Sequence, residues 1–278
     1  MKVRRFAGIE LSTLMLGTVQ FGLRYGIANR GGQPSYETAR AILACAYEGG
    51  VDCLDTASAY GTSEEVVGKA LAELGIADKM VVVSKVYPMA GAFSSRQAAD
   101  EFVEESVTRS LKRLRLDVLP ICLFHWEGNF CYVESLLRLK EKGLVRHIGS
   151  SVMTPGVASH IVSSGLAEAV QIPASILDHR FTRSGIGEDA RRRGTAIFVR
   201  SVYLQGLLLM PEEDIPDELA GVISIRRKLR RLVDDAGMSL GELSVRYVLG
   251  IDGLTCALVG VDSVGRCARI SNGSRRGH

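Results

Sequence analysis

The sequence lacks any hydrophobic run long enough to cross a membrane: none of its stretches approaches the ~20 apolar residues that a spanning helix needs. Its first six residues, Met-Lys-Val-Arg-Arg-Phe, lack the apolar core of a secretory signal. The six cysteines form no Cys-x-x-Cys pair, and the histidines do not stand at metal-ligand spacing, so a disulfide framework and a zinc site are both disfavoured. We therefore expect a cytoplasmic protein with reduced thiols, no membrane partner and no bound metal.

The chain also has little excess charge, because 34 Lys and Arg residues nearly balance 31 Asp and Glu residues to give a formal net charge of +3. Charge alone thus suggests no nucleic-acid partner. The most basic run, residues 226–231, lies among apolar residues at helical spacing and is flanked by acids, which favours a solvated helix face over a phosphate-binding surface. No Gly-x-Gly-x-x-Gly turn marks a Rossmann nucleotide site.

Strand-like and helix-like segments alternate along the whole chain, a pattern typical of a parallel sheet with crossover helices. The expected strands are residues 14–18, 52–56, 80–85, 118–124, 146–150, 168–173, 195–201 and 255–261. Eight such strands predict an α/β fold of the (β/α)8 TIM barrel type, which needs about 250 residues, so we expect residues 1–278 to form a single barrel domain. Residues 2–11 predict a short hairpin that turns at Ala7-Gly8, while residues 19–36 and 207–236 predict long insertions after the first and seventh strands.

Chemically active side chains stand at the ends of three expected strands. Asp55, Lys85 and His125 each follow or complete an apolar run, and Tyr60 lies one short loop beyond Asp55. Because parallel barrels place their catalytic groups at the carboxyl ends of the strands, we expect these four side chains to meet.

This group suits the reduction of a carbonyl compound, in which hydride reaches carbon while oxygen gains negative charge and a proton. A tyrosine phenol, with a pKa of ~10, can donate that proton, and a nearby ammonium should draw its pKa toward neutrality. We expect Lys85 to supply this charge, Asp55 to keep the buried amine protonated, and His125 to donate a hydrogen bond to the carbonyl oxygen.

Each of these residues also has a simpler interpretation. Asp55 could cap the following helix, His125 could be a hydrogen-bonded core histidine, and a single Lys or Tyr at a strand end is usually structural or solvated. The joint order of the four residues favours the catalytic interpretation.

The combination resembles the aldo-keto reductase family. The matching stretches are 16–18 (Leu-Gly-Thr), 55–61 (Asp-Thr-Ala-Ser-Ala-Tyr-Gly), 84–86 (Ser-Lys-Val), 124–126 (Phe-His-Trp), 142–151 (Lys-Gly-Leu-Val-Arg-His-Ile-Gly-Ser-Ser) and 170–173 (Val-Gln-Ile-Pro). They occur in family order over about residues 10–265. The resemblance implies that the hairpin closes the bottom of the barrel and that Asp55, Tyr60, Lys85 and His125 are catalytic.

The resemblance also implies a nicotinamide cofactor, NADPH with NADH as a possibility, bound without a Rossmann turn. Expected contacts for the nicotinamide are Ser150, Ser151 and Gln171, although the usual Ser-Asn pair is here Ser151-Val152. The loop after strand seven should wrap the pyrophosphate, and Arg266 should pair with a 2′-phosphate. The full set of expected cofactor contacts is Gly17, Thr18, Ser150, Ser151, Gln171, Ser201, Tyr203, Leu204, Gln205, Gly206, Ser263 and Arg266.

The carboxyl terminus departs from the family pattern, because the residues after Arg266 do not continue as an apolar helix. We therefore expect the last barrel helix to be truncated or atypical, and Asp262 to place a negative charge near the phosphate site. For the substrate, a small carbonyl compound, Tyr25 and Trp126 are the expected contacts. The basic and polar rim formed by residues 24–30 and 179–180 suits a keto-sugar or a sugar-linked compound.

Three other interpretations stay open from the sequence. The same chemistry could serve a redox-neutral epimerase or an alcohol dehydrogenase. The chain could be a non-catalytic subunit that senses nicotinamide, or a barrel that has lost cofactor binding through its altered end. The sequence does not decide the oligomeric state.

Overall fold

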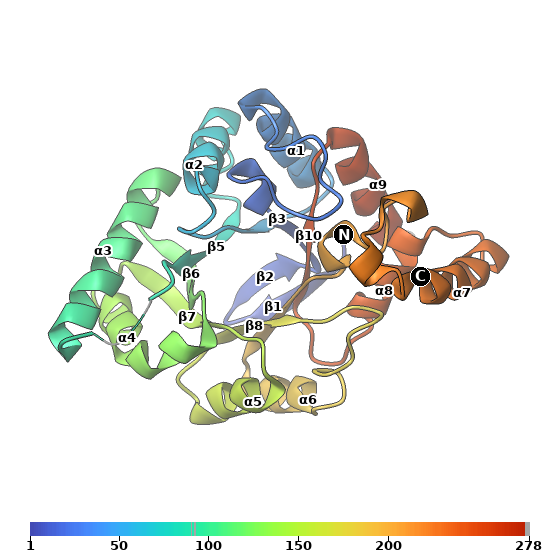
Figure 1. Ribbon diagram of the computed structural model, residues 1–278. Coiled ribbons are helices and arrows are strands. Elements are labelled where there is room, and N and C mark those ends of the chain that lie inside the picture. Colours follow the sequence, from blue (N-terminus) through green and yellow to red (C-terminus); the bar gives the residue numbers. More distant parts are fainter. Residues whose placement is uncertain (90, 92, 276–278) are drawn as a thin grey trace.

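The computed structural model describes residues 1–89, 91 and 93–275, and its centre is a closed barrel of eight parallel strands in the order β10-β3-β4-β5-β6-β7-β8-β9 (Figure 1). The strands are β3 (Leu14–Gly17), β4 (Cys53–Asp55), β5 (Val81–Val86), β6 (Leu119–Phe124), β7 (Val145–Ser151), β8 (Ala169–Pro173), β9 (Ala196–Arg200) and β10 (Cys256–Gly260). All eight coincide with the strands expected from the sequence, so the predicted TIM barrel is confirmed.

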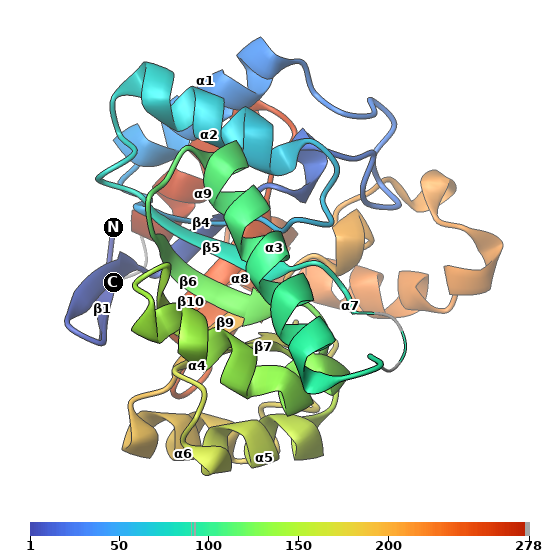
Figure 2. The same cartoon turned by 90° about the vertical axis from the view of Figure 1, so that its left-hand side faces the viewer.

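Helices surround the barrel (Figures 1 and 2). They are α1 (Tyr36–Glu48), α2 (Ser63–Leu74), α3 (Arg96–Leu114), α4 (Val133–Glu141), α5 (Pro155–Ser164), α6 (Ile186–Arg193), α7 (Val222–Asp235), α8 (Leu240–Leu249) and α9 (Val264–Arg275). Serine begins three of them: Ser35, Ser95 and Ser239 each accept a hydrogen bond from a first-turn amide of α1, α3 and α8. Such a cap satisfies one of the free amides at the start of a helix, which explains why the helices begin there.

The predicted hairpin is confirmed as β1 (Val3–Phe6) and β2 (Ile9–Ser12), which pair antiparallel. Ala7 and Gly8 between them have φ values of 48° and 80°, the left-handed pair that a two-residue hairpin turn requires. Phe6 and Leu11 are buried against inward-facing side chains of the barrel, including Met15 and Phe198. The hairpin therefore closes the end of the barrel opposite the carboxyl ends of the strands.

The last helix, α9, spans Val264–Arg275 and packs against α1 and α8, with Cys267 buried. One expectation about the later part of the chain needs correction. The basic run at 226–231 lies on α7 as expected, but it is not wholly solvated, because Arg226 is fully buried. Its guanidinium donates to the carbonyl oxygen of Met210, which shows that α7 packs on the segment that follows β9.

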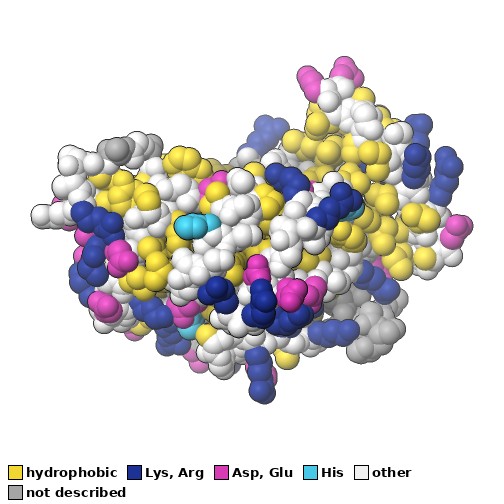
Figure 3. Space-filling model, turned by 90° about the horizontal axis from the view of Figure 1, so that it is seen from below, with side chains coloured by type: hydrophobic (Ala, Val, Ile, Leu, Met, Phe, Trp, Pro, Cys, Tyr) yellow, Lys and Arg dark blue, Asp and Glu magenta, His cyan; other side chains and the backbone are white. Residues whose placement is uncertain are grey.

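The segment around α7 projects from the rest of the molecule, and exposed hydrophobic side chains gather on that side (Figure 3). They include Leu219, Ile225 and Leu232. No helix in the described part of the chain is long and apolar enough to cross a membrane.

Candidate active site

The four strand-end residues come together at the carboxyl-terminal mouth of the barrel. Asp55 is the last residue of β4, Lys85 the penultimate residue of β5, and His125 the first residue after β6. Because β4, β5 and β6 are neighbours in the barrel, their ends meet at one side of the mouth, and Tyr60 reaches the same place from the loop after β4.

Lys85 and Asp55 form a buried ion pair. The Lys85 Nζ donates to Asp55 Oδ2 at 2.6 Å and to the carbonyl oxygen of Thr56 at 2.8 Å, with side-chain exposures of 1% for Lys85 and 4% for Asp55. Gln171 Nε2 donates to the same carboxylate oxygen at 2.8 Å. Burial is the largest single influence and would lower the pKa of Lys85, but the charges and hydrogen bonds of Asp55 and Tyr60 together outweigh it and raise the pKa. The amine is therefore held in its charged form.

Tyr60 lies between this amine and His125. The Lys85 Nζ is 5.0 Å from the centroid of the Tyr60 ring, and the His125 ring stands edge to face with it, 5.5 Å between centroids at 85°. An ammonium and a phenol supplied by neighbouring strands thus approach each other in the way the sequence suggested.

The expected direction of the Tyr60 pKa was wrong. Burial raises the pKa of Tyr60 above its ordinary value of 10.0, and the opposing charge of Lys85 reduces this rise without reversing it. The phenol therefore stays protonated at neutral pH, and the role left for Lys85 is to stabilise the phenolate that forms when the proton leaves.

His125 is neutral at physiological pH. Burial, followed by the charges of Lys85 and Arg200, lowers its pKa to about 3. Its Nδ1 atom is buried and has no hydrogen-bond partner in the described part of the chain. A neutral imidazole can donate one hydrogen bond without competing with the phenol as an acid.

A close contact between two loops fixes the backbone that carries Tyr60. A Cβ on Gly22 would lie 1.8 Å from the Tyr60 carbonyl oxygen, and one on Gly61, whose φ is 54°, would lie 2.3 Å from the Gly22 carbonyl oxygen. Only glycines allow this approach, so the insertion after β3 helps to position the phenol.

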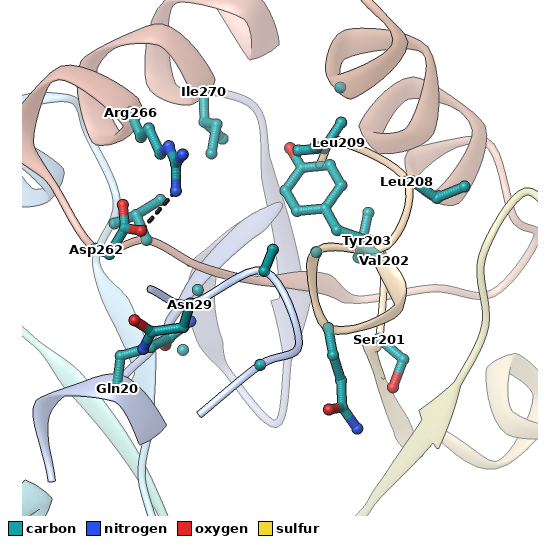
Figure 4. Close-up of a pocket in the computed structure, with 18 of the residues that line it drawn as sticks. Gln20, Asn29, Ser201, Val202, Tyr203, Leu208, Leu209, Asp262, Arg266 and Ile270 are labelled. Atoms are coloured by element: carbon teal, nitrogen blue, oxygen red, sulfur yellow. Dashed lines mark hydrogen bonds and ion pairs between the residues drawn. The ribbon is translucent and has the colours of Figure 1, made fainter. Parts of the chain in front are cut away.

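The mouth opens into a cavity of about 1200 Å³. Asp55, Tyr60 and Gln171 lie at one end of its lining, and α8 and α9 form the other. Figure 4 shows Arg266 and Ile270 reaching from α9, with Tyr203 and Leu209 facing them across the space. Single ligand pockets typically measure about 300–1,000 Å³, so this cavity has room for a dinucleotide together with a small substrate.

Most of the residues expected to contact a cofactor line this cavity: Gly17, Thr18, Gln171, Ser201, Tyr203, Gln205, Gly206 and Arg266. The lining does not include four other expected contacts, Ser150, Ser151, Leu204 and Ser263. The first two lie on β7 and are buried in the barrel wall, where Ser150 donates to the carbonyl oxygen of Ser151. Tyr25, an expected substrate contact, lines the cavity, whereas Trp126 stands outside it and is 54% exposed.

The cavity contains polar atoms that lack partners, which fits a polar ligand. Gln20 Oε1 and Arg246 Nε are buried and form no hydrogen bond in the described residues. Arg246 also pairs with Glu242 at 2.7 Å, and Arg266 pairs with Asp262 at 2.5 Å. These side chains at the α8–α9 end could hold the phosphate-bearing part of a nicotinamide dinucleotide.

The loop after β9 has an unusual backbone. Ser201, Leu204 and Gln205 have φ values of 67°, 49° and 57°, a region that costs non-glycine residues of order 1–3 kcal/mol each and that clusters at functional sites. This loop meets the insertion after β3: the Ala28 amide donates to the Gln205 carbonyl oxygen at 3.5 Å, and Arg30 pairs with Asp214. The two insertions together cover one side of the cavity.

The polar residues of this cavity that the sequence did not single out include Gln20, Arg246 and Arg269. Gln20 follows the matched Leu-Gly-Thr stretch by two residues, so its proximity to that stretch offered a weak signal. Arg200, the last residue of β9, opens the stretch that the resemblance assigns to the pyrophosphate. Arg246 and Arg269 lie on helices, where nothing in the sequence separates them from ordinary surface residues.

Comparisons with known proteins agree with this architecture. The structure resembles that of an aldo-keto reductase from Bacillus halodurans in its holo form, with a TM-score of 0.77 at 22% identity over 99% of this chain and 91% of that one, which shows the shared fold. In sequence, the chain is 28% identical to the aldo-keto reductase YhdN of Bacillus subtilis, over 95% of this chain and 85% of the relative. It is 30% identical to an NADH-specific methylglyoxal reductase of Escherichia coli, over 72% of this chain and 66% of that protein. Residues 13–272 match the family model described as the aldo/keto reductase family. The barrel, its mouth and this match together show that the chain belongs to the aldo/keto reductase family of NAD(P)H-dependent oxidoreductases.

Proposed function

We propose that this protein reduces an aldehyde or ketone to an alcohol with NADPH as the reductant, with Asp55, Tyr60, Lys85 and His125 as its catalytic residues. The observation that carries the proposal is the packing of Tyr60 between the Lys85 ammonium and the neutral His125 ring, at the edge of a cavity large enough for a dinucleotide. When bound, NADPH supplies hydride to the carbonyl carbon.

The residues of this chain manage the proton and the developing charge. His125 donates a hydrogen bond to the carbonyl oxygen and orients it toward the Tyr60 hydroxyl. As hydride arrives, the Tyr60 O–H bond breaks and its proton passes to that oxygen, so one carbonyl, one NADPH and one proton yield one alcohol and one NADP⁺. The phenolate left on Tyr60 is stabilised by Lys85, which Asp55 and the Thr56 carbonyl oxygen hold in place until solvent returns the proton.

The preference for NADPH over NADH rests on the α8–α9 end of the cavity. Arg246, Arg266 and Arg269 line it, and a guanidinium suits the 2′-phosphate that distinguishes NADPH. Asp262 and Glu242 accompany two of these arginines, and one relative is an NADH-specific enzyme. NADH is therefore the comparison cofactor in every assay.

The proposal extends to the setting of the enzyme. We place it in the cytoplasm as one barrel domain. The burial of the Cys53 and Cys122 thiols in the core supports the cytoplasmic location, since buried thiols need no oxidising compartment.

The Tyr60→Phe variant tests the assignment. Loss of a general acid typically costs about 10²–10⁴-fold in rate, so reduction of small aldehydes, followed by the loss of reduced nicotinamide, should fall by that factor. The dissociation constant for NADPH, measured from the fluorescence of Trp126, should stay unchanged. Undiminished turnover by Tyr60→Phe would overturn the role of Tyr60, and failure of the wild-type protein to produce one NADP⁺ per alcohol would overturn the reaction.

A further inference from the structure

One arginine at the catalytic end of the cavity stands apart from the residues already given a role. Arg200 is the last residue of β9 and pairs in register with Pro173 of β8, so its side chain belongs to the same barrel mouth as Asp55 and Gln171. It lines the cavity together with Tyr60 and Tyr25.

The Arg200 guanidinium is held in place by neutral groups. It donates to the carbonyl oxygen of Val152 at 3.3 Å and to Ser201 Oγ at 3.3 Å, and it contacts the sulfur of Met153. It forms no ion pair with a carboxylate in the described part of the chain. These three contacts orient the guanidinium but leave its charge uncompensated.

Four other arginines on the cavity wall differ in this respect, because each of the four has an acidic partner. The pairs are Arg30 with Asp214, Arg230 with Glu212, Arg246 with Glu242, and Arg266 with Asp262. Arg180 on the adjacent rim is likewise paired with Asp178 at 2.7 Å. Arg269, which forms no ion pair in the described part of the chain, lies on α9 at the opposite end of the cavity and is exposed.

The charge balance at the mouth follows from these pairs. Lys85 is neutralised by Asp55, and His125 is uncharged, so the positive charge of Arg200 is the excess at the catalytic end. The charge of Arg200 acts on the reacting groups, since it helps to lower the pKa of His125. Burial lowers the pKa of Arg200 itself, and the charges of Tyr60, Tyr25 and Asp55 oppose this without reversing it. A partly buried guanidinium without a counter-ion pays a desolvation cost that an anionic ligand would offset.

We propose that Arg200 binds an anionic group of the substrate, so that the enzyme acts preferentially on carbonyl compounds that carry a carboxylate or a phosphate. The guanidinium fork matches either group, and both offer the oxygen pair it would hold. This inference rests on the proposed carbonyl reduction and specifies its substrate class.

The test compares charged and uncharged members of matched substrate pairs. The pairs are para-carboxybenzaldehyde with its methyl ester, succinic semialdehyde with its methyl ester, and glyceraldehyde phosphate with glyceraldehyde; the first two probe a carboxylate and the third a phosphate. The proteins are the wild type, Arg200→Gln, Arg200→Lys, and Arg183→Gln as a control that removes one positive charge from an exposed position on the loop after β8.

The wild type should have the higher kcat/KM for the charged member of at least one pair. Arg200→Gln should lose about 10–100-fold in kcat/KM for that member, the range expected for one charge-assisted hydrogen-bonded contact, and change by less than about 3-fold for the uncharged one. Arg200→Lys should recover part of the loss because it keeps the charge without the fork. Arg183→Gln should behave as the wild type.

A binding measurement gives a readout that does not depend on turnover. By titration calorimetry, para-carboxybenzaldehyde should bind NADPH-loaded Tyr60→Phe protein more tightly than its methyl ester does, and Arg200→Gln added to this variant should abolish the difference. Thermal unfolding verifies that each variant is folded.

Two results would overturn the inference. One is a wild type with no preference for the charged member of any pair. The other is an Arg200→Gln variant that loses charged and uncharged substrates equally, or that binds NADPH correspondingly more weakly, in which case Arg200 serves the cofactor or the barrel. If neither member of any pair is reduced while NADPH binds, the proposed function itself fails.

Discussion

The buried pair between Lys85 and Asp55 permits a sharp prediction, because both side chains are almost completely removed from solvent. In Lys85→Met, a side chain of similar length replaces the amine, and among the described residues the Asp55 carboxylate keeps only the hydrogen bond from Gln171. Removal of one partner of a buried ion pair typically destabilises a protein by about 3–5 kcal/mol, because the other charge stays buried and uncompensated. The Thr56 carbonyl oxygen also loses its donor, which adds to the cost.

The double variant Asp55→Asn with Lys85→Met separates the cost of an unpaired charge from the value of the pair. It removes both charges and keeps an oxygen that can accept from Gln171, so it should regain most of the lost stability, to within about 1–2 kcal/mol of the wild type. Urea unfolding at constant m-value measures both differences. Both variants should lack carbonyl reduction, which would show that the pair is retained for chemistry rather than for stability.

A loss of less than about 1 kcal/mol in Lys85→Met would show that Asp55 is not held in an uncompensated buried state. A double variant no more stable than the single one would show that the missing Lys85 packing, and not the orphaned carboxylate, accounts for the change.

The remaining predictions concern His125 and Arg226. Folding lowers the pKa of His125 from 6.5 to about 3, so the neutral imidazole contributes stability that is present above pH 6.5 and lost as the pH drops toward about 3. His125→Gln should therefore flatten the pH dependence of the free energy of unfolding in this window. A pH dependence identical to that of the wild type would contradict the lowered pKa. For the same reason, kcat/KM should show no titration of His125 between pH 5 and 8, which a pH–rate profile checks. Arg226 is fully buried, and its Nε and Nη1 have no hydrogen-bond partner among the described residues, although its guanidinium donates to the Met210 carbonyl oxygen. Arg226→Met should therefore leave the free energy of unfolding unchanged or raise it by about 1 kcal/mol; a loss above about 2 kcal/mol would show that the hydrogen bond to Met210 outweighs the cost of burying the guanidinium.

The barrel itself was determined by local sequence pattern. Each strand is a short apolar run followed by a helical period, and the turn at Ala7-Gly8 needs only two residues that tolerate positive φ, so periodicity and turn chemistry decide these features without reference to distant contacts. Because the fold places all strand ends at one mouth, the encounter of Asp55, Tyr60, Lys85 and His125 followed from the same pattern.

Features that depend on solvent exclusion and on contacts between distant segments were decided only by the tertiary structure. The sequence suggested that Lys85 would lower the Tyr60 pKa, but the degree of burial determines which effect is larger, and burial is a property of the whole packed mouth. Arg226 reads as a surface residue until α7 packs on the segment after β9, and α9 forms despite its polar sequence because α1 and α8 offer it a packing surface. Arg200 could not be distinguished from other arginines on the cavity wall by sequence alone. Only the fold brings Asp214 to Arg30 and Glu212 to Arg230, and leaves Arg200 without a carboxylate partner in the described part of the chain.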